Sequence, residues 1–199
     1  MNVYKIEPFD FASNTFAVTE DGENCILIDC AQPSVVRECK KLGLTPRAVL
    51  LTHGHFDHVG GCQAVQKSGA KIYCTEAEEG LIFGEHLNIF GGMDVPQFTI
   101  DRHICAGESQ ICGIKVQTLF TPGHTSGGAC FIIGDALFTG DTLFKLSVGR
   151  CDLPTGNHRE LIASLKKLAA LQGDYKVYCG HGDDTTLEYE KTNNPWMSL

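Results

Sequence analysis

Short apolar runs separated by turn-forming residues divide the beginning of the chain into predicted strands. Runs rich in β-branched and aromatic residues predict strands at residues 3–6, 15–19 and 25–29. The last two flank the sequence Glu-Asp-Gly-Glu at residues 20–23, which is typical of a tight turn. These three segments are therefore expected to form an antiparallel meander.

Helical and extended patterns alternate in the next part of the chain. Pro33 is expected to open a helix that ends at Gly43, and residues 47–52 have the continuous apolar centre of a buried strand. Three further elements are predicted: a helix at residues 61–67, a strand at residues 71–74 and a short helix from Glu76. Such alternation implies that helices pack on the faces of a sheet.

The second half of the sequence repeats the strand pattern and then ends in helices. Strands are predicted at residues 99–104, 114–120, 129–133, 136–139 and 176–179. Asn157, with Glu160 three positions later, resembles a capping box before an amphipathic helix, and a last helix is expected at residues 185–191. Residues 84–97 lack periodicity and are predicted to form a cover near a pocket.

Composition indicates one globular domain, spanning residues 1–199. The chain is 43% hydrophobic and 20% charged, and it has neither a leader-like N-terminus nor an apolar run long enough to cross a membrane. Its ten cysteines include no C-x-x-C pair, so we expect reduced thiols and a cytoplasmic location. The net charge of -8 argues against nucleic acid as a partner but is compatible with a small anionic substrate.

Residues 52–58 read THGHFDH and place three imidazoles and one carboxylate in a single turn after a predicted strand. Borderline metal ions such as zinc prefer these ligands. The spacing H-x-H-x-D-H would arise by chance with a probability of roughly 0.0008 in a chain of this composition. A turn that is merely rich in polar residues is the alternative, and it explains three histidines within six positions poorly.

His124, Asp141 and His181 also follow predicted strands, and each lies directly after a glycine. Glycine lets the backbone turn sharply and approach a site closely. A single histidine or aspartate in such a loop is more often structural than a ligand, but the shared context of these residues and of the triple-histidine turn indicates one metal site at a common edge.

The motif HxHxDH, followed by separated His, Asp and His, resembles the metallo-β-lactamase fold superfamily along nearly the whole chain. The resemblance implies an α/β (α+β) four-layer αβ/βα sandwich with the site at one edge, between two sheets. By motif position, the first metal ion would be bound by His53, His55 and His124, the second by Asp57, His58 and His181, and both by the bridging Asp141. In the β-lactamases themselves the bridging residue is usually not aspartate, and in the flavodiiron relatives glutamate replaces His55.

Two segments, residues 140–144 (GDTLF) and 147–152 (SVGRCD), are most similar to the glyoxalase II group of hydroxyacylglutathione hydrolases and their short relatives. The full-length enzymes carry a helical C-terminal extension that helps to bind glutathione, whereas this chain ends a short helix after His181. Arg150 stands where those enzymes keep a lysine for the glutathione carboxylate. Asp152 and Asp183 stand where tyrosines line the tripeptide pocket of those enzymes. The resemblance therefore leaves the identity of the substrate's thiol part undecided.

The resemblance implies two divalent metal ions, zinc or alternatively iron or a mixed zinc–iron pair, that activate a bridging hydroxide for thioester hydrolysis. A thiolate leaves without a proton donor, which suits a sequence in which no separate general acid stands out. Asp57 and Asp141 are the candidate catalytic residues. Arg150 is a candidate for binding a substrate carboxylate, unless it pairs with Asp152, and Asp29 is expected to brace the metal loops.

Other functions remain open at this point. A persulfide dioxygenase of the same fold resembles the chain at Gly149, Arg150 and Asp152, and would use one iron bound by the equivalents of His53, His124 and Asp141. A lactonase or a phosphodiesterase would use the same hydroxide. A non-catalytic protein that only stores metal is the remaining alternative. Four residues are expected to lie outside the chemistry: Cys151, His86, His103 and His158. The sequence predicts no oligomeric state.

Overall fold

The computed structural model describes residues 1–9, 12–84 and 97–197. His86 and nearly all of the predicted cover at residues 84–97 lie outside these ranges. Six strands form the first sheet, in the order β1 (Asn2–Ile6), β2 (Thr15–Thr19), β3 (Asn24–Ile28), β4 (Thr45–Leu50), β5 (Lys71–Cys74) and β6 (Arg102–His103). The first three are antiparallel, which confirms the predicted meander, and β3 to β6 are parallel.

The second sheet also has six strands, and all but one pair of neighbours are antiparallel. Its order is β14 (Thr185–Thr186), β13 (Lys176–Cys179), β10 (Ala136–Gly140), β9 (Ala129–Ile133), β8 (Ile114–Phe120) and β7 (Gly107–Ile111). The parallel pair is β10 and β13. These two strands therefore end at the same edge of the sheet, where Asp141 and His181 follow them. A separate hairpin, β11 (Leu143–Phe144) and β12 (Ser147–Val148), lies after β10.

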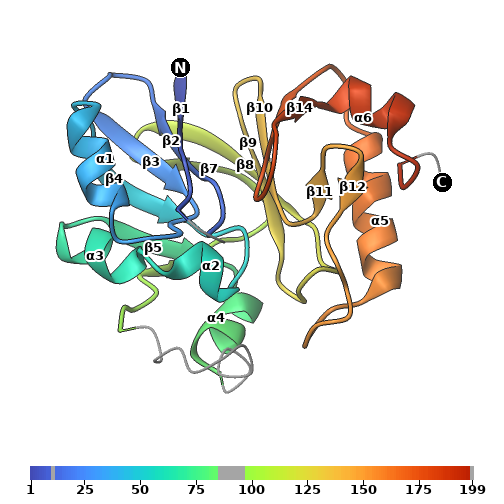
Figure 1. Ribbon diagram of the computed structural model, residues 1–199, viewed down its shortest axis with the longest axis horizontal. Helices are drawn as coiled ribbons and strands as arrows, with labels where there is room; N and C mark the ends of the chain where they lie inside the picture. The colour runs from blue at the N-terminus through green and yellow to red at the C-terminus, as the bar shows by residue number, and fades with distance from the viewer. Residues whose placement is uncertain (10–11, 85–96, 198–199) are drawn as a thin grey trace.

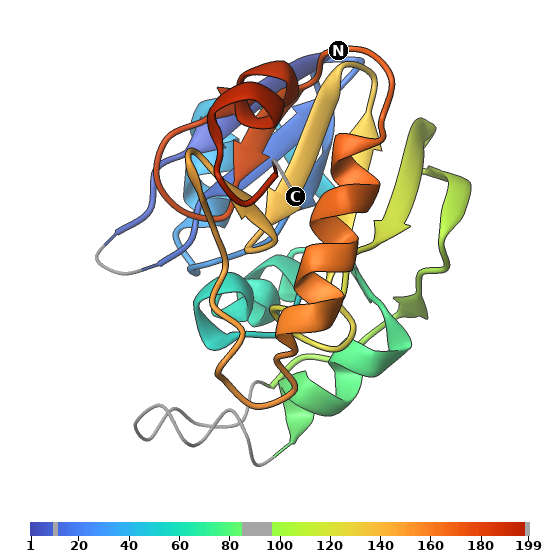
Figure 2. The ribbon, with the colours of Figure 1, turned by 90° about the vertical axis from the view of Figure 1, so that its right-hand side faces the viewer.

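The two sheets pack face to face, and helices cover their outer faces (Figure 1). The helices are α1 (Val35–Lys41), α2 (Phe56–Val59), α3 (Cys62–Lys67), α4 (Glu76–Phe83), α5 (His158–Ala169) and α6 (Leu187–Asn193). Residues of α1 and α3 pack on the first sheet, and α5 lies across the outer face of the second sheet (Figure 2). This order of layers confirms the predicted four-layer αβ/βα sandwich.

The apolar patterns of the sequence explain the central layers. The strands β2, β9 and β10 are buried along their whole length. One face of each strand meets the opposite sheet, and the other face packs into the hydrophobic cluster beneath the helices. Phe16, Phe138 and Tyr178 meet between the sheets, where the Phe138 and Tyr178 rings are stacked with centroids 5.1 Å apart. The amphipathic α5 begins as predicted, since the Asn157 side chain accepts hydrogen bonds from two backbone amides of its first turn.

Several small elements differ from the sequence prediction. β7 was not predicted because it is an exposed edge strand of mostly polar residues, with no apolar alternation. The strand expected at residues 99–104 contains only Arg102 and His103. In the segment expected to be a helix at residues 185–191, the first two residues form the short strand β14, and the helix α6 begins at Leu187. The ten cysteines are all free. Among the described residues, no helix is long and apolar enough to cross a membrane.

Replacing Phe138 by alanine should lower the free energy of unfolding by about 3–5 kcal/mol, because it leaves a cavity between the two sheets. The matched control is Phe9→Ala: Phe9 is 73% exposed, so this change should cost less than about 0.5 kcal/mol. Urea unfolding of both variants measures the difference. Equal losses would contradict the assigned core.

Candidate metal centre

The four loops that carry the candidate ligands meet at one edge of the two sheets. The turn with His53, His55, Asp57 and His58 follows β4, His124 follows β8, and Asp141 and His181 follow the parallel strands β10 and β13. The Gly180 amide donates a hydrogen bond to the carbonyl oxygen of Gly140 at 2.9 Å and so joins the last two loops. A Cβ atom at Gly180 would lie 2.2 Å from Asp141 Oδ1, so only glycine allows this approach.

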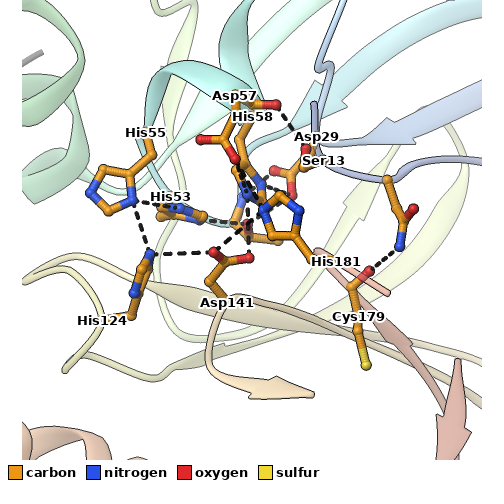
Figure 3. Close-up of polar contacts among 12 residues, drawn as sticks. Ser13, Asp29, His53, His55, Asp57, His58, His124, Asp141, Cys179 and His181 are labelled. Atoms are coloured by element: carbon orange, nitrogen blue, oxygen red, sulfur yellow. Dashed lines mark hydrogen bonds and ion pairs between the residues drawn. The ribbon is translucent and has the colours of Figure 1, made fainter. Parts of the chain in front are cut away.

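A first group of three imidazoles points inward from two loops (Figure 3). His53 Nε2 lies 3.1 Å from His55 Nδ1, and His55 Nδ1 lies 2.9 Å from His124 Nε2. All three rings are buried. Three nitrogen atoms at these separations fit around one metal ion.

A second group lies beside the first and is more open to solvent. His181 Nε2 is 3.0 Å from Asp57 Oδ2, and His58 Nε2 is 3.7 Å from the same oxygen. His58 is fully buried, whereas the His181 side chain is 37% exposed. Asp57, His58 and His181 thus also lie close enough together to bind one ion, on the more exposed side of the site.

Asp141 lies between the two groups (Figure 3). Its Oδ1 atom is 3.3 Å from His58 Nε2, and its Oδ2 atom is 3.5 Å from His124 Nε2 and 3.7 Å from His181 Nε2. One carboxylate therefore faces ring nitrogens of both groups.

The hydrogen bonds behind the rings determine which nitrogen atoms face inward with a lone pair. His124 Nδ1 lies 2.7 Å from the carbonyl oxygen of Arg150, which can only accept, so the ring donates there and a neutral His124 has its lone pair at Nε2. Thr52 Oγ1 donates to Asp29 and therefore accepts from His53 Nδ1, with the same consequence for His53. At least two of the three converging nitrogens thus lack a hydrogen.

The donor atoms fit bound cations. Among the described residues, His58 Nε2 and Asp141 Oδ1 are buried without a hydrogen-bond partner, although they lie only 3.3 Å apart. Buried polar atoms without a partner are costly, and a divalent metal ion would satisfy both. The His and Asp residues at this edge therefore fit a pair of divalent metal ions.

Asp29 braces the triple-histidine turn, as the resemblance implied. Its two carboxylate oxygens accept hydrogen bonds from the Thr52 amide and the Thr52 hydroxyl, and His58 Nδ1 lies 2.8 Å from Oδ2. Asp29 itself has a φ angle of 56°, an uncommon conformation for a residue other than glycine. Its side chain fixes the orientation of the His58 ring, with Nε2 pointing at the site.

Burial and neighbouring charges act differently on the two groups. Burial lowers the pKa of His53 and His124 and lowers the pKa of His55 to about 4, so these rings are neutral at neutral pH. Burial also opposes charge on His58, but the nearby Asp141 and Asp29 outweigh it and raise the pKa of His58. The first group is therefore ready to bind a metal ion, and the second attracts positive charge.

A cavity of about 450 Å³ opens over the metal-ligand candidates. His55, Asp57, His124, Asp141 and His181 form its polar part. The remaining described lining consists of three apolar side chains and one cation: Phe56, Phe144, Leu153 and Arg150. The Arg150 guanidinium also forms the alternative contact named above, a two-point ion pair with Asp152 at 2.6 and 2.7 Å, and both side chains are mostly exposed.

The structure brings all seven predicted ligands together and places Arg150 at the same cavity. His103 and His158 lie elsewhere: His103 contacts Glu79, and the His158 ring lies near Trp196. Cys151 is half-buried and packs against the core under α5. Sequence reasoning missed the apolar lining and Glu78, a fully buried carboxylate on α4 that accepts hydrogen bonds from two ligand loops.

Known proteins resemble this chain in both sequence and structure. Residues 8–181 match the family model described as the metallo-beta-lactamase superfamily. Hydroxyacylglutathione hydrolase GloC of Haemophilus influenzae is 34% identical over 209 residues, a match that covers 100% of this chain and 99% of the relative.

Two solved structures have the same arrangement of elements. BLEG-1, described as a B3 metallo-beta-lactamase, superimposes with a TM-score of 0.88, at 28% identity and 100% coverage of both chains. TTHA1623, described in a di-iron-bound form, gives a TM-score of 0.86 at 34% identity and covers 97% of this chain and 99% of its own. With the family match over most of its length and a full-length relative, this chain belongs to the metallo-beta-lactamase superfamily and is one of its metal-dependent hydrolases.

Proposed function

We propose that the protein hydrolyses small thioesters at a centre of two divalent metal ions. The ligands would form two groups that share one carboxylate: His53, His55 and His124; Asp57, His58 and His181; and Asp141 between them. The observation that carries this proposal is that His58 Nε2 and Asp141 Oδ1, buried at the junction of the two groups, have no hydrogen-bond partner among the described residues. When bound, such a pair of ions supplies Lewis acidity and lowers the pKa of water toward neutrality.

The protein's own residues would hold the reactants and manage the protons. Asp57 lines the cavity, and its carboxylate lies 3.0 Å from His181, so it is placed to orient a water molecule and to accept its proton. Asp141, held between His58 and His124, keeps the two groups of ligands at a fixed separation. Phe56, Phe144 and Leu153 supply the apolar part of the cavity lining.

The lining of the cavity supports a thioester as the substrate. Apart from the proposed ligands, the described lining residues are Phe56, Phe144, Leu153 and Arg150, and none of them titrates near neutral pH. A leaving group that departs as an anion is therefore favoured, and a thiol with a pKa of about 8.5 meets this condition. The relative named hydroxyacylglutathione hydrolase supports the same substrate class, because an acyl group on the glutathione thiol is a thioester.

We propose zinc as the bound metal, with iron or a zinc–iron pair as the alternative that the di-iron form of TTHA1623 supports. Histidine and carboxylate ligands suit both metals. We further propose that residues 1–199 act as one domain, that the substrate is a small molecule with an anionic group, and that hydrolysis takes place in the cytoplasm.

The metal-loaded protein should hydrolyse thioesters faster than lactones, phosphodiesters or β-lactams, and a chelator should abolish the activity until zinc or iron(II) is added back. Elemental analysis should find about two ions per chain. A single iron together with oxygen uptake on a persulfide would instead identify the dioxygenase alternative. Preference for a β-lactam would place the activity with BLEG-1, and a metal-loaded protein inert to all these substrates would contradict catalysis.

Asp141→Asn should lower kcat/KM by roughly 100-fold or more and reduce the bound metal below two ions, because the amide keeps the size of the side chain but removes its charge. Asp135→Asn is the matched control, since Asp135 lies just before the other end of β10 and pairs with Lys176 on the surface. It should leave both quantities unchanged. Full metal content and activity in Asp141→Asn would exclude the shared-ligand role.

Arg150→Gln should raise KM about tenfold for a thioester that carries a carboxylate, with kcat little changed, because a charge-assisted contact to the substrate is lost. A neutral thioester with the same acyl group should show no change. Asp152→Asn serves as the control: it also breaks the ion pair but leaves Arg150 free, so KM should not rise. If both variants raise KM equally for both substrates, the ion pair only supports the loop.

A further inference from the structure

Glu78 connects two metal-ligand loops that come from different sheets. Its side chain is fully buried on α4, and each carboxylate oxygen accepts a hydrogen bond from a different loop. The Gly54 amide donates to Oε2 at 2.6 Å, and the Gly127 amide donates to Oε1 at 2.8 Å. Gly54 lies between two candidate ligands of the first group, and Gly127 lies three residues after the third.

The helix α4 packs directly against both peptides. A Cβ atom at Gly54 would lie 2.7 Å from Ile82, and a Cβ atom at Gly127 would lie 2.6 Å from Thr75 Oγ1. Thr75, at the start of the helix, also donates a hydrogen bond to the Gly127 carbonyl oxygen at 2.7 Å. The two loops are thus positioned against one rigid helix and not only against each other.

This contact determines a distance that matters for metal binding. His55 follows Gly54, and its Nδ1 atom lies 2.9 Å from His124 Nε2 of the other loop. A backbone hydrogen bond from Ala129 to the carbonyl oxygen of Thr52 joins the same two loops close to the sheets. Glu78 adds a second connection beyond the ligands, and two connections restrict rotation of the loops where one would leave a hinge.

We propose that Glu78 is a positioning residue that sets the spacing of His55 and His124 and thereby the affinity of the ion bound by the first group. The inference rests on the metal centre proposed above. Burial raises the pKa of the Glu78 carboxyl, and the Thr125 side chain and the two glycine amides oppose this rise. A glutamine at this position would turn an NH₂ group toward one of the two amides, and that loop would lose its acceptor.

The test measures metal affinity in the full-length protein. Metal-free wild type and Glu78→Gln are titrated with zinc against a competing chelator, and His124→Ala identifies which ion belongs to the first group. Glu78→Gln should weaken that ion about tenfold or more, within the range known for residues that orient ligands, and should leave the other ion within about threefold of wild type.

Two controls separate positioning from a general loss of stability. Glu190→Gln removes another fully buried carboxylate, which accepts hydrogen bonds from the Leu146 amide and Thr185 on the α6 side; within the described part of the chain, no hydrogen bond joins it to a proposed ligand. It should lower the Tm but leave both metal affinities unchanged. Glu79 lies on the same helix as Glu78 but is half-exposed beside His103. Glu79→Gln should therefore change neither the Tm nor the affinity for either ion.

The outcomes are distinct. Unchanged affinity for both ions in Glu78→Gln, or an equal loss for both, would overturn the positioning role. If Glu78→Gln does not fold, Thr75→Val replaces it, because this change removes only the hydrogen bond to Gly127. A loss of about threefold for the same ion is then expected, and unchanged affinity overturns the inference. A wild type that binds no pair of ions contradicts the proposed metal centre instead.

Discussion

Lone pairs face one another across a buried space at the edge of the two sheets, and this arrangement needs positive charge. The ring N–H groups of His53 and His124 point outward, to Thr52 and to the Arg150 carbonyl oxygen. The Nε2 atom of each neutral ring, which faces the site, therefore has no hydrogen to donate. Asp141 adds a carboxylate to the same space. Because mutual repulsion would push these groups apart, the rest of the fold has to hold them together, and a bound cation converts the repulsion into attraction.

The fold supplies that restraint through strand ends. The strands β4, β10 and β13 each pack into two of the three hydrophobic clusters, so their last residues have little freedom. Loops that begin at these strand ends therefore start from fixed positions, and their side chains can still point into a cavity.

The sequence predicted the parts of this structure that depend on local pattern. Buried strands leave short continuous apolar runs, the amphipathic α5 leaves a periodic pattern, and the triple-histidine turn is too dense to be accidental. Long-range contacts leave no such signal. Glu78 looks like any acidic residue in the first turn of a helix, and only the folded chain shows its carboxylate between two loops. The polar edge strand β7 escaped prediction for the related reason that its pairing depends on its neighbour and not on its own composition.

Three buried carboxylates hold loops in place: Asp29 and Glu78 hold metal-ligand loops, and Glu190 holds the turn of the β11–β12 hairpin. Each accepts at least one backbone N–H from a loop that cannot satisfy it within a sheet or helix. Burying a charged group is unfavourable unless it is well hydrogen-bonded, so these side chains are stable only while the loops keep their shape, and the loops keep their shape only while the side chains are present. This mutual dependence extends the site into the outer layers. Substitutions in α4 can therefore change the geometry of the ligands, and substitutions in α6 that of the β11–β12 hairpin, without touching either directly.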